Sequence, residues 1–103
     1  TYGIRPDAVL STPNINMFLE MDMGSESISQ LREKWSHYRT YVASKNFYES
    51  KKRTVVLFIC NNKGRIDDRM NLIKSSINEF FLDCCNENID IYIGIPEKLL
   101  SVI

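Results

Sequence analysis

The sequence predicts a single α/β domain in which helices cover a mixed β-sheet in three layers. Strict alternation of apolar and polar residues over positions 15–23 is typical of a strand. Apolar stripes with helical spacing over 28–42 and 66–84 indicate two amphipathic helices. The run 54–59 is apolar and β-branched, as in a central strand covered on both faces. Because helices between strands imply crossovers, the order strand-strand-helix-strand-helix-strand favours an antiparallel hairpin followed by parallel strands.

Local signals delimit the first elements. Residues 7–10 are a short apolar run after Pro6, ended by the turn-forming residues 11–14, which is typical of a strand entering a hairpin. Gly24 ends the second strand. Ser27 with Gln30 three positions later has the form of a capping box, so the first helix begins there.

The second half is delimited in the same way. Residues 50–53 form a basic turn before the central strand, and residues 61–64 form a loop after it. The second helix follows from residue 66 to residue 84, and residues 89–95 form a last strand. Pro96 predicts the start of a short terminal helix.

Length and composition indicate one globular domain, residues 1–103. With 44% hydrophobic and 25% charged residues, the chain has enough apolar surface for one core and is not intrinsically disordered. Its longest apolar run, 55–60, is too short to cross a bilayer, so we expect no membrane partner. The chain begins with Thr1 in a segment already in progress, from which we expect a fragment of a longer protein.

Charge and cysteine content narrow the function classes. Thirteen basic residues balance thirteen acidic ones, so the charge of the whole chain gives no reason for a polyanion to bind. Three cysteines, without a C-x-x-C pair, fit free thiols in a reducing compartment, and we expect a cytoplasmic location. The absence of a glycine-rich phosphate loop argues against a nucleotide cofactor, and the single histidine, His37, argues against a zinc site.

One group of residues has the spacing of a site. Asp7 opens the first strand, while Glu20 and Asp22 lie two residues apart on the second, so pairing of the hairpin brings three carboxylates to one side of the sheet. Carboxylates this close repel one another unless a hard cation such as Mg²⁺ or Mn²⁺ holds them. Such a cation polarises a phosphodiester and lowers the pKa of bound water. The alternative is an ordinary polar strand face in solvent.

The surrounding residues resemble a known family. Pro6-Asp7 and Glu20-x-Asp22 on a hairpin, followed by a helix and a strand, resemble the core of the PD-(D/E)xK nuclease superfamily. Three sequence segments are similar to the bacterial replication-relaxation family of plasmid and mobile-element proteins. They are Arg5-Pro6-Asp7-Ala8, Phe18-Leu19-Glu20-Met21-Asp22 and Leu31-x-x-Lys34-x-x-x-Tyr38-x-x-Tyr41. This resemblance extends over residues 4–45. Beyond residue 54 it depends only on the order of helices and strands.

The resemblance implies roles for individual residues. Asp7 and Glu20 would be the metal ligands, for Mg²⁺ or Mn²⁺, with the Met21 carbonyl as a further ligand. The superfamily's lysine would fall at position 22, where this chain has Asp22, which would instead add charge to the site. Lys34, one helical turn before Tyr38, is the candidate substitute and would contact the phosphate.

A basic and aromatic face predicts contact with nucleic acid. Positive and aromatic side chains on the first helix and the following turn have the character needed to follow a phosphate backbone and stack on bases. The predicted DNA-contacting residues are Lys34, Tyr38, Arg39, Tyr41, Lys51, Lys52 and Arg53. The alternative is a solvated helix face beside half-buried tyrosines.

Two functions follow from these observations. The first is a DNA-associated domain of a replication-relaxation protein that cleaves phosphodiesters with a metal, by nicking, through Asp7, Glu20, Asp22 and Lys34. The second is a nuclease-like fold without catalysis that binds DNA, a protein partner, or an upstream winged-helix region of the same chain.

Overall fold

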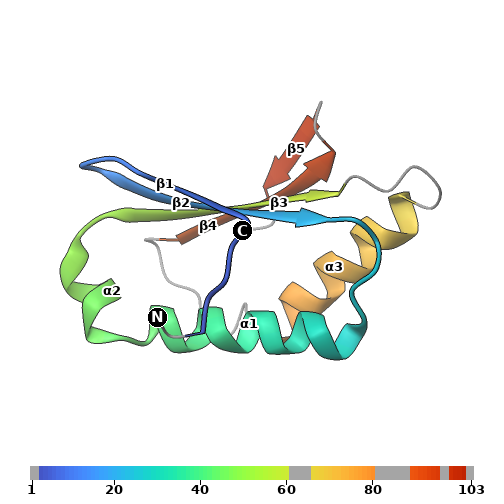
Figure 1. Ribbon diagram of the computed structural model, residues 1–103, viewed down its shortest axis with the longest axis horizontal. Helices are drawn as coiled ribbons and strands as arrows, with labels where there is room; N and C mark the ends of the chain where they lie inside the picture. Colours follow the sequence, from blue (N-terminus) through green and yellow to red (C-terminus); the bar gives the residue numbers. More distant parts are fainter. Residues whose placement is uncertain (1–2, 61–65, 81–88, 96–97, 102–103) are drawn as a thin grey trace.

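The computed structural model is a mixed α/β domain with one five-stranded sheet (Figure 1). The structure describes residues 3–60, 66–80, 89–95 and 98–101. In chain order the elements are β1 (Ala8–Ser11), β2 (Ile15–Asp22), α1 (Ile28–Val42), α2 (Lys45–Ser50), β3 (Arg53–Cys60), α3 (Ile66–Phe80), β4 (Ile89–Ile95) and β5 (Lys98–Ser101).

The sheet follows the chain without a change of order. Its strands lie as β1-β2-β3-β4-β5, with β1 antiparallel to β2, the three strands β2, β3 and β4 parallel, and β5 antiparallel to β4. The predicted hairpin followed by parallel strands is therefore confirmed.

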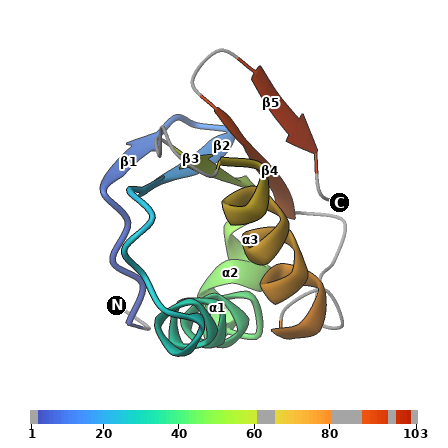
Figure 2. The same cartoon turned by 90° about the vertical axis from the view of Figure 1, so that its right-hand side faces the viewer.

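The three predicted layers are wrong, because the described helices all lie on one face of the sheet (Figure 2). The strand order gives the physical reason. Right-handed crossovers from β2 to β3 and from β3 to β4 move in the same direction across the sheet, so both place their helices on the same side. A third layer would require the strand order to reverse. The central strand β3 is accordingly covered by helices on one face only.

The polar face of β2 is the covered one. Glu20 and Asp22, 1% and 0% exposed, lie on the helix side of the sheet, whereas Met17, Leu19 and Met21 on the other side are half-buried. The alternation predicted for this strand is confirmed, but of its apolar residues Phe18, on the same face as the two carboxylates, packs on α1, and Met17, Leu19 and Met21 lie on the face away from the helices. Two carboxylates are instead buried in a small domain, and each needs a partner there.

The core forms between α1, α3 and the inner face of the strands. Trp35 of α1, Phe58 of β3 and Ile73 of α3 are fully buried in one cluster. Trp35 Nε1 donates a hydrogen bond to Ser76 Oγ at 2.9 Å, which joins α1 to α3. The predicted capping box is present, with Ser27 and Gln30 bonding each other's backbone N–H. This motif fixes the point at which α1 leaves the hairpin.

Two elements differ from the sequence prediction. The terminal helix predicted at Pro96 is wrong, because residues 98–101 form β5, where their backbone pairs with the edge of β4. The additional helix α2 (Lys45–Ser50) was not predicted. Its N-cap is Ser44, whose Oγ accepts the Phe47 N–H, and its C-cap is Lys51, with a φ of 58°. The predicted end of α3 at residue 84 and the loop 61–64 lie outside the described residues.

Among the described helices, none is both long enough and apolar enough to cross a membrane.

Candidate functional site

Asp7 binds the backbone of β2 on both sides of Glu20. Its N–H donates to the Leu19 carbonyl at 2.8 Å, and its Oδ2 accepts the Met21 N–H at 2.7 Å. Where β1 begins, the Met21 N–H thus has the Asp7 carboxylate as its acceptor. Asp7 therefore has a structural role, and this role also holds its carboxylate beside Glu20.

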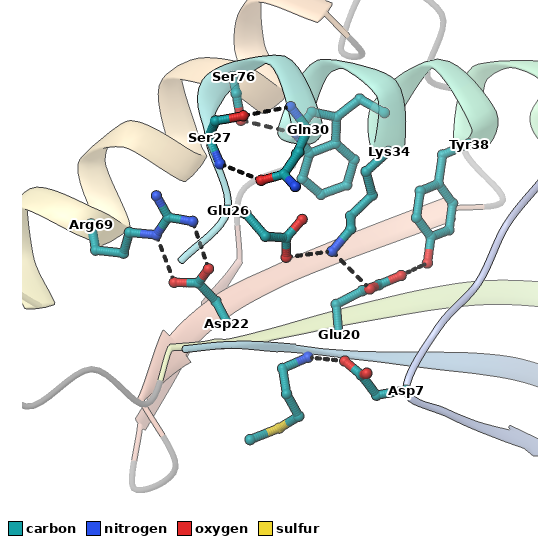
Figure 3. Close-up of polar contacts among 12 residues, drawn as sticks. Asp7, Glu20, Asp22, Glu26, Ser27, Gln30, Lys34, Tyr38, Arg69 and Ser76 are labelled. Atoms are coloured by element: carbon teal, nitrogen blue, oxygen red, sulfur yellow. Dashed lines mark hydrogen bonds and ion pairs between the residues drawn. The ribbon is translucent and has the colours of Figure 1, made fainter. Parts of the chain in front are cut away.

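Glu20 is the centre of a buried polar cluster (Figure 3). Its Oε2 accepts the Tyr38 hydroxyl at 2.6 Å, and its Oε1 lies 3.1 Å from Lys34 Nζ. Both partners come from α1 and lie one helical turn apart. The sequence analysis assigned Lys34 to the same candidate site as Glu20, and the structure brings these two together, whereas the bond of Tyr38 to Glu20 was not predicted.

The pKa values of this cluster depend on its burial. Burial raises the pKa of Glu20, and the nearby Asp7 carboxylate adds to the rise, although Tyr38 and Lys34 oppose it. Burial also raises the pKa of Tyr38, as does the charge of Glu20, so the phenol stays protonated and donates. Burial lowers the pKa of Lys34, but the bond to Glu26 and the charge of Glu20 outweigh it, and the net direction is upward. Lys34 is therefore an ammonium ion.

Lys34 has a second carboxylate partner. Its Nζ lies 2.8 Å from Glu26 Oε1, in the connection between β2 and α1. The same ammonium lies 5.1 Å from the centroid of the Phe58 ring, a distance suited to a cation–π contact. Glu26 was not predicted from the sequence, since its position one residue before the helix cap carries no spacing signal.

A pocket of about 390 Å³ opens beside the cluster. Its walls come from the segment before β1, from β2 and from α1. The lining residues are Gly3, Ile4, Arg5, Glu20, Glu33, Lys34, His37 and Tyr38. Arg5 and His37 were not predicted as site residues. They line the pocket because the segment before β1 lies against α1. Three residues of the buried cluster, Glu20, Lys34 and Tyr38, thus form part of the lining of this pocket.

Asp22 does not join this cluster. It is fully buried, and both of its carboxylate oxygens accept bonds from Arg69 of α3, from Nε at 2.8 Å and from Nη2 at 2.7 Å. Bonding to Asp22 is the main cause of the raised pKa of Arg69. Asp22 therefore connects β2 to α3, away from Glu20 and Lys34 (Figure 3). Arg69 lies 47 positions along the chain, so no local pattern indicated the pair.

The predicted DNA-contacting residues are divided between different surroundings. Tyr38 is 1% exposed, so its ring offers no face for a base, and the half-buried Tyr41 packs on Phe18 and Phe47. Arg39 and Lys51 are exposed. Lys52 donates to Ser11 Oγ at 3.0 Å, and Arg53 forms an ion pair with Asp90.

The basic turn lies far from the pocket along the strands. Ile15, at the start of β2, pairs with Arg53, whereas Glu20 pairs with Phe58 five residues further along. At about 3.3 Å per residue, the two places are separated by roughly 16 Å along the sheet.

The donor set fits a hard cation in kind. Asp7 and Glu20 offer carboxylate oxygens, and the Met21 carbonyl points to the same strand edge as the Met21 N–H that Asp7 binds. Within the described part of the chain, no three His, Cys, Asp or Glu side chains are grouped as metal ligands. A cation here would therefore have two carboxylates, with backbone and water oxygens completing its coordination.

The fold and the site define a mixed α/β domain with a carboxylate–lysine–tyrosine cluster at its hairpin. The family model for replication-relaxation proteins matches residues 3–57, just over half of the 103 residues, and the chain belongs to this family. The family predicted from the sequence motifs in residues 4–45 is confirmed. Membership of this family supports a role related to replication. The searches of curated proteins and of solved structures gave no significant match.

Proposed function

We propose that this domain associates with DNA in a replication-relaxation protein, and that the pocket beside Glu20 is where a divalent cation and a DNA phosphate meet. The observation that supports it most is the buried ion pair of Glu20 and Lys34 in the wall of an open pocket. Burying both charges is costly, and a hydrophobic pair would hold α1 against β2 at lower cost. Buried charges that adjoin a cleft are characteristic of functional sites.

The charge around the pocket sets a condition on DNA binding. The carboxylates on or near the pocket are Asp7, Glu20, Glu26 and Glu33, and the cations are Arg5 and Lys34. This excess of negative charge repels a polyanion. A divalent cation between Asp7 and Glu20 would neutralise this excess and remove the repulsion, so DNA should bind at the pocket only in the presence of Mg²⁺ or Mn²⁺.

The residues would then have distinct roles. Asp7, Glu20 and the Met21 carbonyl would hold the cation, which when bound polarises a phosphodiester and acidifies a water. Lys34 would contact the phosphate. In this role the Lys34 ammonium, which comes from α1, would take the place of the superfamily's lysine at position 22. Tyr38 keeps the Glu20 carboxylate in place through its hydroxyl.

A second function is favoured by a specific observation. The carboxylates named as ligands already have protein partners, Met21 for Asp7 and both Lys34 and Tyr38 for Glu20. The same contacts can serve as a structural network in a nuclease-like fold without catalysis. Such a module would bind DNA or a protein partner through other surfaces, including the basic turn at Lys51 and Lys52.

Calorimetric titration with Mn²⁺ separates the two functions. Asp7→Asn keeps an oxygen that accepts the Met21 N–H but removes the negative charge, so it tests metal binding without removing the structural bond. We expect the wild-type domain to bind Mn²⁺ and Asp7→Asn to bind at least about tenfold more weakly, with an unchanged melting temperature. Equal Mn²⁺ affinity in the two proteins, or none in either, would exclude the metal site.

A nicking assay on supercoiled plasmid with Mn²⁺ then tests catalysis. Cleavage that is lost in Asp7→Asn and in Lys34→Met would establish a nuclease. Metal binding without cleavage would leave a metal-dependent DNA-binding site. If neither occurs and reversal of charge at Lys51 and Lys52 weakens DNA binding, the module without catalysis is the correct description.

A further inference from the structure

We infer that Glu26 is a positioning residue, which holds the Lys34 ammonium when the Glu20 carboxylate binds a divalent cation. This inference rests on the proposed function, because it concerns how the same site accepts its metal. It assigns a role to a carboxylate that belongs neither to the hairpin motif nor to the pocket wall.

The geometry places one ammonium between two unequal carboxylates. Lys34 Nζ lies 3.1 Å from Glu20 Oε1 and 2.8 Å from Glu26 Oε1. The Glu20 side chain is 2% exposed and that of Glu26 is 25% exposed, so the shorter bond is to the more accessible partner. The Lys34 side chain, 19% exposed, therefore has a partner near solvent as well as one in the interior.

The local structure keeps Glu26 at this place. Glu26 directly precedes Ser27, the N-cap of α1, and the capping box fixes the Ser27 backbone through Gln30 Oε1 at 2.7 Å. Lys34 lies two turns further along the same helix. The carboxylate and the ammonium are thus joined to one rigid element, and their contact does not depend on the position of Glu20.

Charge balance explains why the second partner matters. A cation bound by Glu20 takes up the negative charge that Lys34 neutralises and repels the ammonium. A largely buried ammonium without a counter-ion is costly, so a lysine with Glu20 as its sole partner would oppose metal entry. With Glu26 present, Lys34 keeps one charge-assisted bond while Glu20 is released. Glu26 also keeps the ammonium next to the cation, where a phosphate would bind.

A different explanation is that Glu26 merely adds negative charge that attracts a cation. The two explanations differ in whether the effect of Glu26 requires Lys34. Glu33 provides the matched control, because it lines the same pocket from an exposed position and the ion pairs of Lys34 in the described part of the chain are with Glu20 and Glu26.

The first experiment needs no metal. Melting temperatures are measured for Glu20→Gln, Glu26→Gln and the double variant in the presence of a chelator. If the two carboxylates share Lys34, each single change leaves it one partner, and the double variant loses more than the sum of the single losses. Additive losses would overturn the inference.

The second experiment is a Mn²⁺ titration of Glu26→Gln in two backgrounds. With Lys34 present, we expect affinity to fall about tenfold, because the ammonium remains with Glu20 and competes with the cation. In Lys34→Met the same change should alter affinity less than about twofold, as should Glu33→Gln in the wild-type background. Equal losses in both backgrounds would overturn the inference in favour of simple attraction. Failure of the wild-type domain to bind Mn²⁺ would refute the proposed metal site and, with it, this role of Glu26, while the metal-free experiment would still show whether Lys34 is shared.

Discussion

Removal of the Arg69 guanidinium should destabilise the domain severely. Asp22 is 0% exposed, and Arg69 donates two bonds to it, at 2.8 and 2.7 Å. Arg69→Met is shorter but keeps the unbranched apolar stem of the side chain, and it leaves the carboxylate buried without its partner. The variant therefore isolates the loss of the charge pair.

The magnitude follows from the burial of the pair. Breaking a buried ion pair by removing one partner costs about 3–5 kcal/mol, out of a total of about 5–15 kcal/mol for a domain. The corresponding fall in melting temperature is at least about 12 °C for a chain of this size. Replacing both members, as in Asp22→Leu with Arg69→Met, should restore stability to within about 1 kcal/mol of the wild type, because no charge then remains buried.

Urea unfolding followed by circular dichroism measures both variants. Lys74→Met, at an exposed position on the same helix, controls for the loss of a cation from α3 and should change stability by less than about 0.5 kcal/mol. A loss below about 1 kcal/mol for Arg69→Met would refute the structural role of the pair. If the double variant were stable yet had lost Mn²⁺ binding, Asp22 would belong to the metal site after all.

Three further predictions concern the core, the thiol and the pocket. Ile91→Ala on the covered face should cost about 2–5 kcal/mol in urea unfolding, and the same change at half-buried Ile59 on the uncovered face clearly less; equal losses would contradict the two-layer packing. Burial raises the pKa of Cys60 to about 11, and the charge of Asp22 adds to this rise. In a variant whose other cysteines are replaced by serine, the folded Cys60 thiol should therefore react with iodoacetamide at pH 8 at least about a hundredfold more slowly than the thiol unfolded in urea. Comparable rates would show that the thiol is accessible in the folded domain. Gly3→Ala should displace the His37 ring, because φ is +77° and the new Cβ would lie 2.8 Å from the ring; an unchanged His37 NMR signal would contradict this contact.

The helices and strands were predictable where they depend on local chemistry. The capping box at Ser27 and the apolar stripe of α1 gave the bounds of that helix, and the alternation of β2 gave the strand. The number of layers was not predictable in this way, because it depends on the order of strands in the sheet. A strand such as β3 that is apolar on both sides suggested cover on both faces, whereas the described helices cover one.

The candidate site was predictable only in part for a related reason. Glu20, Lys34 and Tyr38 come from two neighbouring elements, so strand period and helix period together bring them to one place. Asp22 lies on the same strand face as Glu20, and period alone suggested that both face the same site. Its partner Arg69 comes from α3, and only the packing of that helix against β2 separates the two carboxylates.

The surroundings of positions 22 and 34 explain where a positive charge can be placed in the proposed site. The side chain at position 22 points at α3, where a lysine would lie against the Arg69 guanidinium and have no carboxylate to bind. Asp22→Lys, which would create a Glu-x-Lys motif, would therefore bury two cations together. An ammonium can reach Glu20 from α1, and there it is held on both sides, by Glu20 and by Glu26. In this chain, then, the contact of Arg69 with Asp22 makes the strand position unsuitable for a lysine, and the first turns of α1 are where the positive charge of the site can be placed.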